Sequence, residues 1–443
     1  MAQAHPGAEP TTAAPAAPKP RAPQILRALR HRNYRIFFSG QLISLIGTWM
    51  QQVAQSWLVY RLTGSSLLLG LVGFASQIPV CLLAPLGGAA ADRTSRRNIL
   101  IATQTASMLL AAILAGLTLS GHVTIPHLFV LAAALGVVNA FDIPARQAFA
   151  VEMVGREDLI NAIALNSSMF NGARVIGPAI AGVLVGAIGE GFCFLANAVS
   201  FFAVIAGLLA MRMPPPKPRP AARSSALADI AEGFRFVGST GPILGLLLLL
   251  GVVSLTAVPY AVLMPIFADR ILHGGPSGLG LLMGASGTGA VIGALTLAAR
   301  TRLTGLGTWI AASSAAFGAS LILFSLSRSF WLSAALLVPA GFAMMVQMAG
   351  SNTLVQRMVP DALRGRVMAV YSMMFMGMAP IGALLAGGLA DRIGAPLTVA
   401  AGGVVCILAA GVFAVQLPAL RGPARELILA QEAEIAEAPQ TVP

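Results

Sequence analysis

Charge is what this 443-residue sequence has least of. Asp, Glu, Lys and Arg together make up 10% of it, whereas apolar residues make up 57%. A soluble domain averages about 25% charged residues, and a chain this poor in charge cannot cover a surface that faces water. The composition therefore excludes an ordinary soluble protein and predicts one that has membrane lipid as its first partner.

Clusters of metal-binding and catalytic side chains are absent from the sequence as well. Cys81, Cys193 and Cys406 each stand alone in an apolar stretch, and none of the five histidines lies in the middle of one. This is not the paired spacing of a disulfide framework or a metal site. We expect no metal, no cofactor and no enzyme activity.

Basic residues outnumber acidic ones, 28 to 16, which gives a net charge of +12. They occur in short segments between apolar runs and form no continuous basic face with interleaved aromatic residues. The sequence therefore does not indicate nucleic acid as a partner.

Long apolar runs are what the sequence has in place of charge. A helix needs about 20 such residues to cross the hydrocarbon layer of a membrane. Six runs precede a Pro-rich break and six follow it, which predicts an all-α membrane protein with twelve transmembrane helices. The predicted spans are 36–60, 66–91, 98–119, 125–149, 160–187, 191–211, 242–267, 277–299, 306–326, 329–353, 365–389 and 396–417.

The distribution of basic residues predicts the orientation of these spans. With the N-terminus inside, the outer connections hold only Arg61, Arg270, Arg328 and Arg392, and Arg174 lies within a span. The remaining basic residues fall in inner segments, as the positive-inside rule requires. Both termini are therefore predicted to be cytoplasmic.

The same pattern divides the chain into five parts. They are a disordered cytoplasmic tail (1–33), a six-helix bundle (34–212), a cytoplasmic linker with an amphipathic helix (213–240), a second six-helix bundle (241–418) and a cytoplasmic tail (419–443).

The two bundles resemble each other in sequence. Residues 154–182 align with 359–387 at a shift of 205 without gaps, so that Gly182 meets Gly387. Two bundles in the same orientation form a parallel repeat about an axis along the membrane normal. Such a repeat supports a site between the halves that opens to either side in turn, which favours a transporter over a membrane enzyme.

The first motif is 87-GGAAADRTSRRN-98, between the second and third spans. It resembles the hallmark of the major facilitator superfamily, except that Ser95 replaces a glycine. A glycine here allows a neighbouring helix to approach, and the acid can pair with a cation or with the positive start of a helix. The resemblance implies a latch for the outward-open state; a simple positive-inside anchor is the alternative. The latch residues are Gly88, Asp92, Arg93, Arg96 and Arg97.

The sequence 387-GGLADRIG-394 looks like a second copy of this motif. By the span count it faces outside, so we interpret it as a chance likeness. Asp391 and Arg392 are then an outer surface pair of little energetic weight.

Asp142 lies near the inner boundary of the fourth span, within expected reach of Arg93 or Arg96. An ionisable residue in a span is a functional candidate by default. We expect Asp142 and Arg146 to form a charge relay with the latch, and Asp142 to couple transport to protons. A structural cap on the connection to the fifth span is the alternative.

Arg174 lies near the middle of the fifth span, where a charge costs at least about 2.5–3.5 kcal/mol. No acidic residue is expected at the same depth, so a bound anion, water or backbone carbonyls are its possible partners. The first span also carries a polar stripe at helical spacing, which must turn away from lipid. The predicted cavity residues are Arg174, Gln41, Ser44, Thr48, Gln51, Gln55, Asn139, Gln347 and Tyr371.

The fifth span also contains 172-GARVIGPAIAG-182, in which Gly177, Pro178 and Gly182 resemble the antiporter motif of superfamily exporters. Small residues allow close helix packing and the proline lets the helix bend. An ordinary packing seam would use the same residues.

Across residues 30–417 the chain resembles the enterobactin-exporter-like branch of the superfamily, which also includes macrolide-efflux-type proteins. The resemblance is carried by the segment that follows His31, by NAFDIPARQAF, and by the two repeated stretches. It implies the major facilitator fold and proton-driven efflux by alternating access across the inner membrane of a bacterium. We expect a monomer with a small-molecule substrate.

No acidic residue is expected at the depth of Arg174. This favours an anionic or neutral siderophore, metabolite or drug as the substrate. Uptake by the same fold is one alternative, and a non-catalytic membrane sensor is another.

Overall fold

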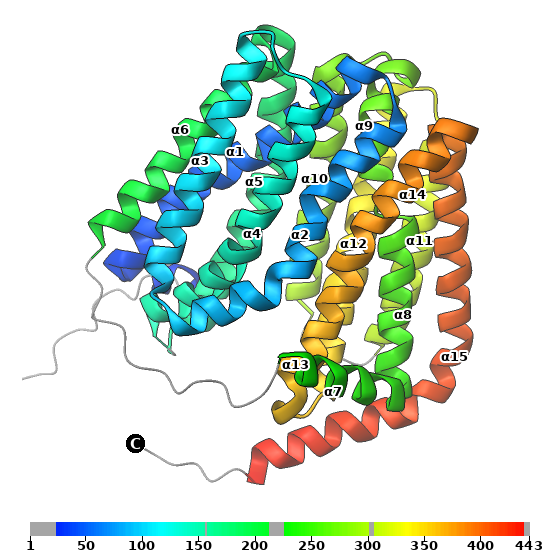
Figure 1. Cartoon of the computed structure of the whole chain (residues 1–443). Helices are drawn as coiled ribbons and strands as arrows, with labels where there is room; N and C mark the ends of the chain where they lie inside the picture. The colour runs from blue at the N-terminus through cyan, green and yellow to red at the C-terminus, as the bar shows by residue number, and fades with distance from the viewer. Residues whose placement is uncertain (1–23, 156, 212–225, 301–304, 438–443) are drawn as a thin grey trace, which may run out of the picture.

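The computed structural model describes residues 24–155, 157–211, 226–300 and 305–437, and nearly all of them are helical (Figure 1). The predicted tail up to residue 23 and the Pro-rich part of the linker, 212–225, lie outside the described residues. We name the end of the molecule that carries the first and last described residues, 24 and 437, inner, following the predicted orientation, and the opposite end outer.

The first half is a bundle of six long helices. They are α1 (Arg32–Thr63), α2 (Ser66–Arg93), α3 (Arg96–Leu119), α4 (Ile125–Val154), α5 (Leu159–Ile188) and α6 (Glu190–Ala210).

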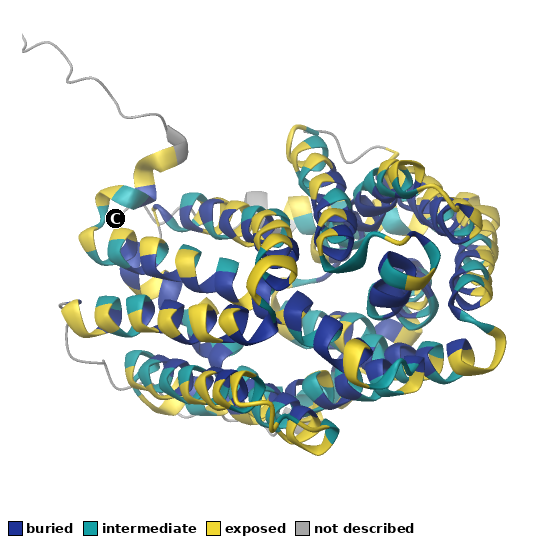
Figure 2. Ribbon diagram, turned by 90° about the horizontal axis from the view of Figure 1, so that it is seen from above, coloured by how far each residue is buried: buried dark blue, intermediate teal, exposed yellow. Residues whose placement is uncertain are grey.

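The second half repeats this arrangement with two interrupted helices. They are α8 (Gly241–Thr256) with α9 (Tyr260–Ile266) and η2 (Phe267–Ile271), α10 (Gly275–Ala298), α11 (Leu306–Leu326), α12 (Phe330–Met358), α13 (Asp361–Ser372) with η3 (Met373–Gly377) and α14 (Met378–Ile393), and α15 (Ala395–Glu437). Viewed from above, buried residues gather on the packed faces of the helices and exposed residues on their outward faces (Figure 2).

Eleven helices among the described residues are long and apolar enough to span a membrane, which confirms the all-α membrane fold. Each corresponds to a predicted span, with boundaries shifted by a few residues. The first predicted span is α1, which has 32 residues but is too polar to be counted with the eleven. Its polar side chains are tolerated because α1 packs against α5 and α6.

The two halves contact each other through two helix pairs. Helix α5 of the first half packs against α10 of the second half, and α14 of the second half packs against α2 of the first half. The aligned stretches place α5 and α14 at equivalent positions of the repeat, so the second pair is the first with the halves exchanged. This exchange is what an axis between two parallel repeats produces.

The contacts between the halves lie toward the outer end. Gly182 and Gly186 of α5 approach the start of α10 at Ser277, and Gly387 of α14 approaches the start of α2 at Ser66. At the inner end no hydrogen bond or ion pair between described side chains joins the halves, and the bundles lie apart there in Figure 1. The ribbons of the two halves therefore meet at the outer end and separate toward the inner end (Figure 1).

Two terminal segments differ from the predicted boundaries. The predicted disordered tail extends to residue 33, but residues 24–30 form a short 3-10 helix, η1 (Gln24–Arg30). It packs on α5: Arg27 and His31 both pair with Asp158, at 2.7 and 2.8 Å, and Asn161 accepts a hydrogen bond from the Ala28 amide. At the other end α15 continues through the predicted tail as a helix and bends along the inner face (Figure 1).

The predicted linker helix is α7 (Ala226–Ser239). Its acids Asp229 and Glu232 pair with Arg366 of α13, both at 2.8 Å. The linker helix is therefore fixed to the second half.

Candidate functional site

Arg174 points toward the centre of the molecule rather than toward lipid. On α5, Ile176 and Val183 form an exposed apolar face, 45% and 65% exposed. Arg174 lies on the other side of this helix, between Gly177, which packs against α1, and the backbone contact of its own carbonyl with Gly287 of α10. The helical repeat of 100° per residue places its side chain on the face of α5 that lies toward α1 and α10.

The surroundings of the Arg174 guanidinium are aromatic. It lies over the ring of Trp49 of α1, 5.8 Å from the ring centroid. No ion pair between described side chains includes Arg174. A cation beside an aromatic ring, without a carboxylate as partner, can accept an anion.

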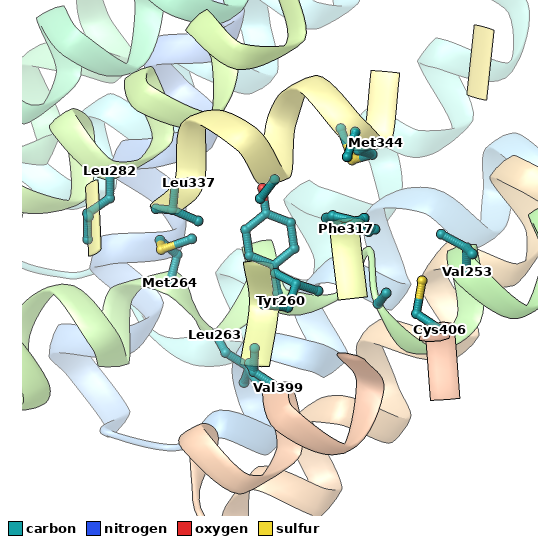
Figure 3. Packing of buried hydrophobic residues seen from close by; sticks show 14 of the residues in the cluster. Val253, Tyr260, Leu263, Met264, Leu282, Phe317, Leu337, Met344, Val399 and Cys406 are labelled. Atoms are coloured by element: carbon teal, nitrogen blue, oxygen red, sulfur yellow. The ribbon is translucent and has the colours of Figure 1, made fainter. Parts of the chain in front are cut away.

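Tyr260 extends this site into the second half. Helix α8 ends at Thr256, and α9 begins at Tyr260, directly after Pro259. The Tyr260 hydroxyl is 2.7 Å from the Ser286 hydroxyl of α10, and its ring packs edge-on against Phe317. Figure 3 shows this ring among the apolar side chains of the second half. Neither Tyr260 nor Ser286 is among the predicted cavity residues.

The polar stripe of α1 does not form one cavity wall. Gln51 accepts a hydrogen bond from Asn197 of α6 at 2.7 Å, and Ser44 is buried on the same side. Gln41 is also buried, with no partner for its side-chain oxygen among the described residues. Only Thr48, which is exposed, and Gln55, which is half-buried, remain free to line a cavity.

The other three predicted cavity residues also differ in accessibility. Asn139 is half-buried on α4. Gln347 is 1% exposed, and its side-chain nitrogen has no partner among the described residues. The Tyr371 hydroxyl donates a hydrogen bond to the Met348 carbonyl at 2.8 Å, so it holds α13 against α12.

Asp142 lies in a polar cluster between α3 and α4, and it is 3% exposed. Its carboxylate accepts hydrogen bonds from Thr103 and Gln104, both at 2.8 Å, and pairs with Arg146 at 3.3 Å. The predicted link to Arg146 is present, but the predicted reach to Arg93 or Arg96 is wrong for this conformation. Thr103 and Gln104 of α3 bind Asp142 instead. These two adjacent polar residues within the apolar third span could have predicted this contact.

The latch motif is anchored to the first half. Arg96 donates to the Ala148 carbonyl at 2.8 Å and pairs with Glu152 at 3.1 Å, while Arg97 donates to the Leu208 carbonyl at the end of α6. Asp92 and Arg93 are exposed at the inner end. No hydrogen bond or ion pair between described residues joins this motif to the second half.

The glycine that brings helices together in this motif is Gly87 rather than Gly88. A side chain at Gly87 would collide with the Ala140 carbonyl of α4, whereas nothing lies within 4 Å of one at Gly88. No helix packs against Gly88 in this conformation, so a helix could pack there in another conformation.

The outer surface pair was an incorrect interpretation of Asp391. Its carboxylate accepts a hydrogen bond from the Ser66 amide at 2.8 Å and one from the Ser65 hydroxyl at 3.1 Å. It therefore caps the start of α2 across the boundary between the halves. The span count placed Asp391 on the outer side, but it could not show which helix begins beside it.

Two further contacts close the outer end. The Tyr60 hydroxyl donates to Asp269 at 2.7 Å, and Arg270 donates to the Gly64 carbonyl at 3.2 Å while lying over the Tyr60 ring. Each bond joins α1 or the turn after it to η2 of the second half.

The predicted antiporter motif forms part of the seam between the halves. Gly280 of α10 fits against the Pro178 carbonyl, and a side chain at Gly182 would lie 3.0 Å from the Gly280 Cα. Its repeat equivalent, Gly387, approaches Gly70 of α2 in the same way. Gly177 instead packs within the first half, against Trp49.

Two repeated bundles that meet at one end, with a charged site between them at mid-depth, define a membrane transporter of the major facilitator type. Residues 24–436 match the family of transmembrane secretion effectors, and the chain belongs to this family. The predicted resemblance to exporters of siderophores and drugs is thereby confirmed.

Curated relatives agree with this assignment. The chain is 28% identical to the staphyloferrin A transporter of Staphylococcus aureus over 84% of its own length and 94% of the relative. It is 30% identical to the multidrug efflux pump Tap of Mycolicibacterium fortuitum over 83% and 91%. It is 28% identical to the enterobactin exporter EntS of Shigella boydii over 81% and 85%.

Solved structures show the same fold. A mutant of the nucleoside transporter NupG superimposes with a TM-score of 0.71 at 13% identity, over 87% of this chain and 99% of that one. A bacterial homologue of the iron transporter ferroportin in the inward-facing state gives a TM-score of 0.64 at 17% identity, over 86% and 98%.

Proposed function

We propose that this protein exports a small anionic or neutral molecule, such as a siderophore, across the inner membrane of a bacterium by proton antiport. The observation that carries the proposal is Arg174, a cation between the halves that lies over the Trp49 ring and has no carboxylate within ion-pair distance among the described residues. The relatives whose names include a siderophore support the same substrate class.

Substrate binding is assigned to the face of α5 that lies toward α1 and α10. Arg174 supplies charge and up to five N–H donors. Trp49 supplies a flat apolar face from the first half, and α10 of the second half packs against the Arg174 backbone at Gly287, so a molecule bound at Arg174 lies beside both halves. A site shared in this way changes shape when the halves rock, which is the requirement for alternating access.

Proton coupling is assigned to Asp142. When its carboxylate takes up a proton, its attraction for Arg146 is lost and one oxygen becomes a donor. The hydrogen bonds from α3 must then rearrange. Protonation therefore changes the packing of α3 on α4, next to the latch that begins α3.

The test uses inside-out membrane vesicles with an imposed pH gradient. We expect enterobactin or staphyloferrin A to accumulate in vesicles that contain the wild-type protein, and the cationic dye ethidium not to. Arg174→Gln should lower accumulation of the anions roughly 10- to 100-fold, because a hydrogen bond to a charged group contributes about 1.5–3 kcal/mol. Arg174→Lys should retain part of the activity.

The matched control is Arg328→Gln, an exposed arginine at the outer end. It should leave accumulation unchanged. Full activity of Arg174→Gln, or a preference for ethidium, would show that the site does not bind anions. Accumulation only in right-side-out vesicles would show uptake instead of export.

A further inference from the structure

A cavity separate from the site at Arg174 lies at the inner end of the second half. Its volume is about 720 Å³, and it lies where α8 and α11 begin, where α12 ends and where α15 bends. Its wall is mainly apolar and includes Leu246, Met358, Phe413 and Leu417. The cavity is half open, so a molecule can enter it from the side.

The mouth of this cavity is basic. Arg421 and Arg425 of α15 line it, and both are exposed. Arg421 donates a hydrogen bond to the Thr308 hydroxyl at 2.9 Å, which fixes its guanidinium at the rim. Glu432 lies at the far end, and a neighbouring hollow of about 320 Å³ adds Arg357.

The bend in α15 explains why charge and apolar surface meet here. Pro418 and Pro423 lie within the helix where it leaves the transmembrane bundle. Beyond them the helix runs along the inner face (Figure 1), with Leu420 and Ile428 packed toward the core. Arg421 and Arg425 therefore lie at the level where lipid headgroups lie, with the apolar wall extending toward the bilayer interior.

We propose that this cavity binds an anionic phospholipid of the inner leaflet. The phosphate of the headgroup pairs with Arg421 and Arg425, and an acyl chain fills the apolar wall. Basic pockets between transmembrane helices on the cytoplasmic side are suited to anionic headgroups. A soluble anion would use the arginines and leave the apolar surface unfilled, and a neutral lipid would leave the two charges without a partner.

The experiment is native mass spectrometry of the full-length protein in a neutral detergent. The probes are phosphatidylglycerol, phosphatidylcholine with the same acyl chains, and inorganic phosphate. We expect phosphatidylglycerol to bind most tightly. The double variant Arg421→Gln/Arg425→Gln should bind it about 30-fold more weakly, because each arginine contributes about 1 kcal/mol to binding of an anionic lipid.

Three further variants separate the two parts of the cavity from each other and from misfolding. Arg421→Lys/Arg425→Lys keeps the charge and should retain binding within a few-fold. Ala424→Phe fills the wall and should weaken both lipids. Arg328→Gln/Arg392→Gln removes two outer arginines and should change nothing. Thermal unfolding in lipid-free detergent checks that each variant is folded.

Four results would overturn the proposal. They are equal binding of the two lipids, displacement of phosphatidylglycerol by inorganic phosphate, unchanged binding by the glutamine double variant, and unchanged binding by Ala424→Phe. None of these measurements requires transport, so they are independent of the export proposal.

Discussion

At the scale of single residues, two charges within the predicted spans, Asp142 and Arg174, have different surroundings. Asp142 is surrounded by Thr103, Gln104 and Arg146, so its charge is balanced within the first half. Arg174 lies over the Trp49 ring and has no ion pair with a described side chain. A balanced charge is suited to switching with a proton, whereas an unbalanced one is suited to a ligand that brings the opposite charge.

Replacing Asp142 by Asn should separate substrate binding from proton coupling. Asn keeps an oxygen for Thr103 and Gln104 but cannot change its charge. We expect the Asp142→Asn protein to bind substrate and to lose most of its gradient-driven efflux, with little remaining dependence on pH. Efflux measured in vesicles at several imposed pH gradients checks this.

The control for this prediction is Asp92→Asn, which alters an exposed acid outside the cluster. It should slow efflux without removing its pH dependence. Wild-type efflux with unchanged pH dependence in Asp142→Asn would assign proton coupling to another group.

Sequence reasoning found both charges and the link from Asp142 to Arg146, but not their other neighbours. Asp142 and Arg174 stand out because an ionisable residue in an apolar run is rare. Gln104, however, lies 38 residues before Asp142 in the sequence, on another helix. Ser286 likewise contacts Tyr260 from another helix. Which face of one helix meets which face of another depends on packing, and apolar runs contain no periodic signal for it.

At the scale of helices, the two seams between the halves depend on glycine. Gly182 approaches the backbone of α10, and Gly387 approaches the backbone of α2. In lipid, helices associate through close packing of small residues rather than through the hydrophobic effect. A larger side chain at either seam therefore affects closure of the outer end directly.

We expect Gly182→Val to abolish transport without unfolding the protein. The new side chain would meet backbone atoms of α10 that cannot rotate away, and overpacking of this kind costs about 1–3 kcal/mol. The outer end would then fail to close. Vesicle transport, together with thermal unfolding in detergent, measures the two effects separately.

Gly172→Val on the same helix is the matched control, because nothing lies within 4 Å of a side chain there. It should transport normally. If both valine variants were equally active, the seam at Gly182 would not take part in closure.

Helix positions were more predictable than helix contacts. The run 66–91 became α2 (Ser66–Arg93), and 306–326 became α11 (Leu306–Leu326), because length and hydropathy suffice for a span. The interruption at Pro259 and the extension of α15 were not predicted. Both depend on what the neighbouring helices bury, which composition does not report.

At the scale of the whole molecule, one helix pair carries an acid at each end. Asp391, at the end of α14, caps the start of α2 on the outer side. Asp92, at the end of α2, is exposed on the inner side, where the same partner helix begins as α13. The two similar motifs therefore lie at opposite ends of the same pair.

Removing the outer acid should shift the balance between the two open states. Asp391→Ala loses the cap on α2, worth about 0.5–2 kcal/mol, and should raise the share of outward-open molecules about 2- to 30-fold. Spin labels at His122 and Ser329, both exposed in outer connections, report the separation of the halves. Arg392→Ala removes the adjacent exposed residue and should leave the distances unchanged.

An unaltered distance distribution in Asp391→Ala would mean that the cap contributes nothing to outer closure. The bonds of Tyr60 and Arg270, with that of the Ser277 hydroxyl to the Gly182 carbonyl, would then hold that end.

The placement of both acids on one pair of helices has a consequence for the energy supply of the cell. Under the proposed latch, a rocking motion that brings Asp92 to α13 moves Asp391 away from α2. The contact of Asp92 with α13 and the contact of Asp391 with α2 therefore alternate. A continuous water path through the protein would let ions run down the membrane potential. Because only one of the two contacts is broken at a time, one end stays closed and no such leak forms while the substrate is transported.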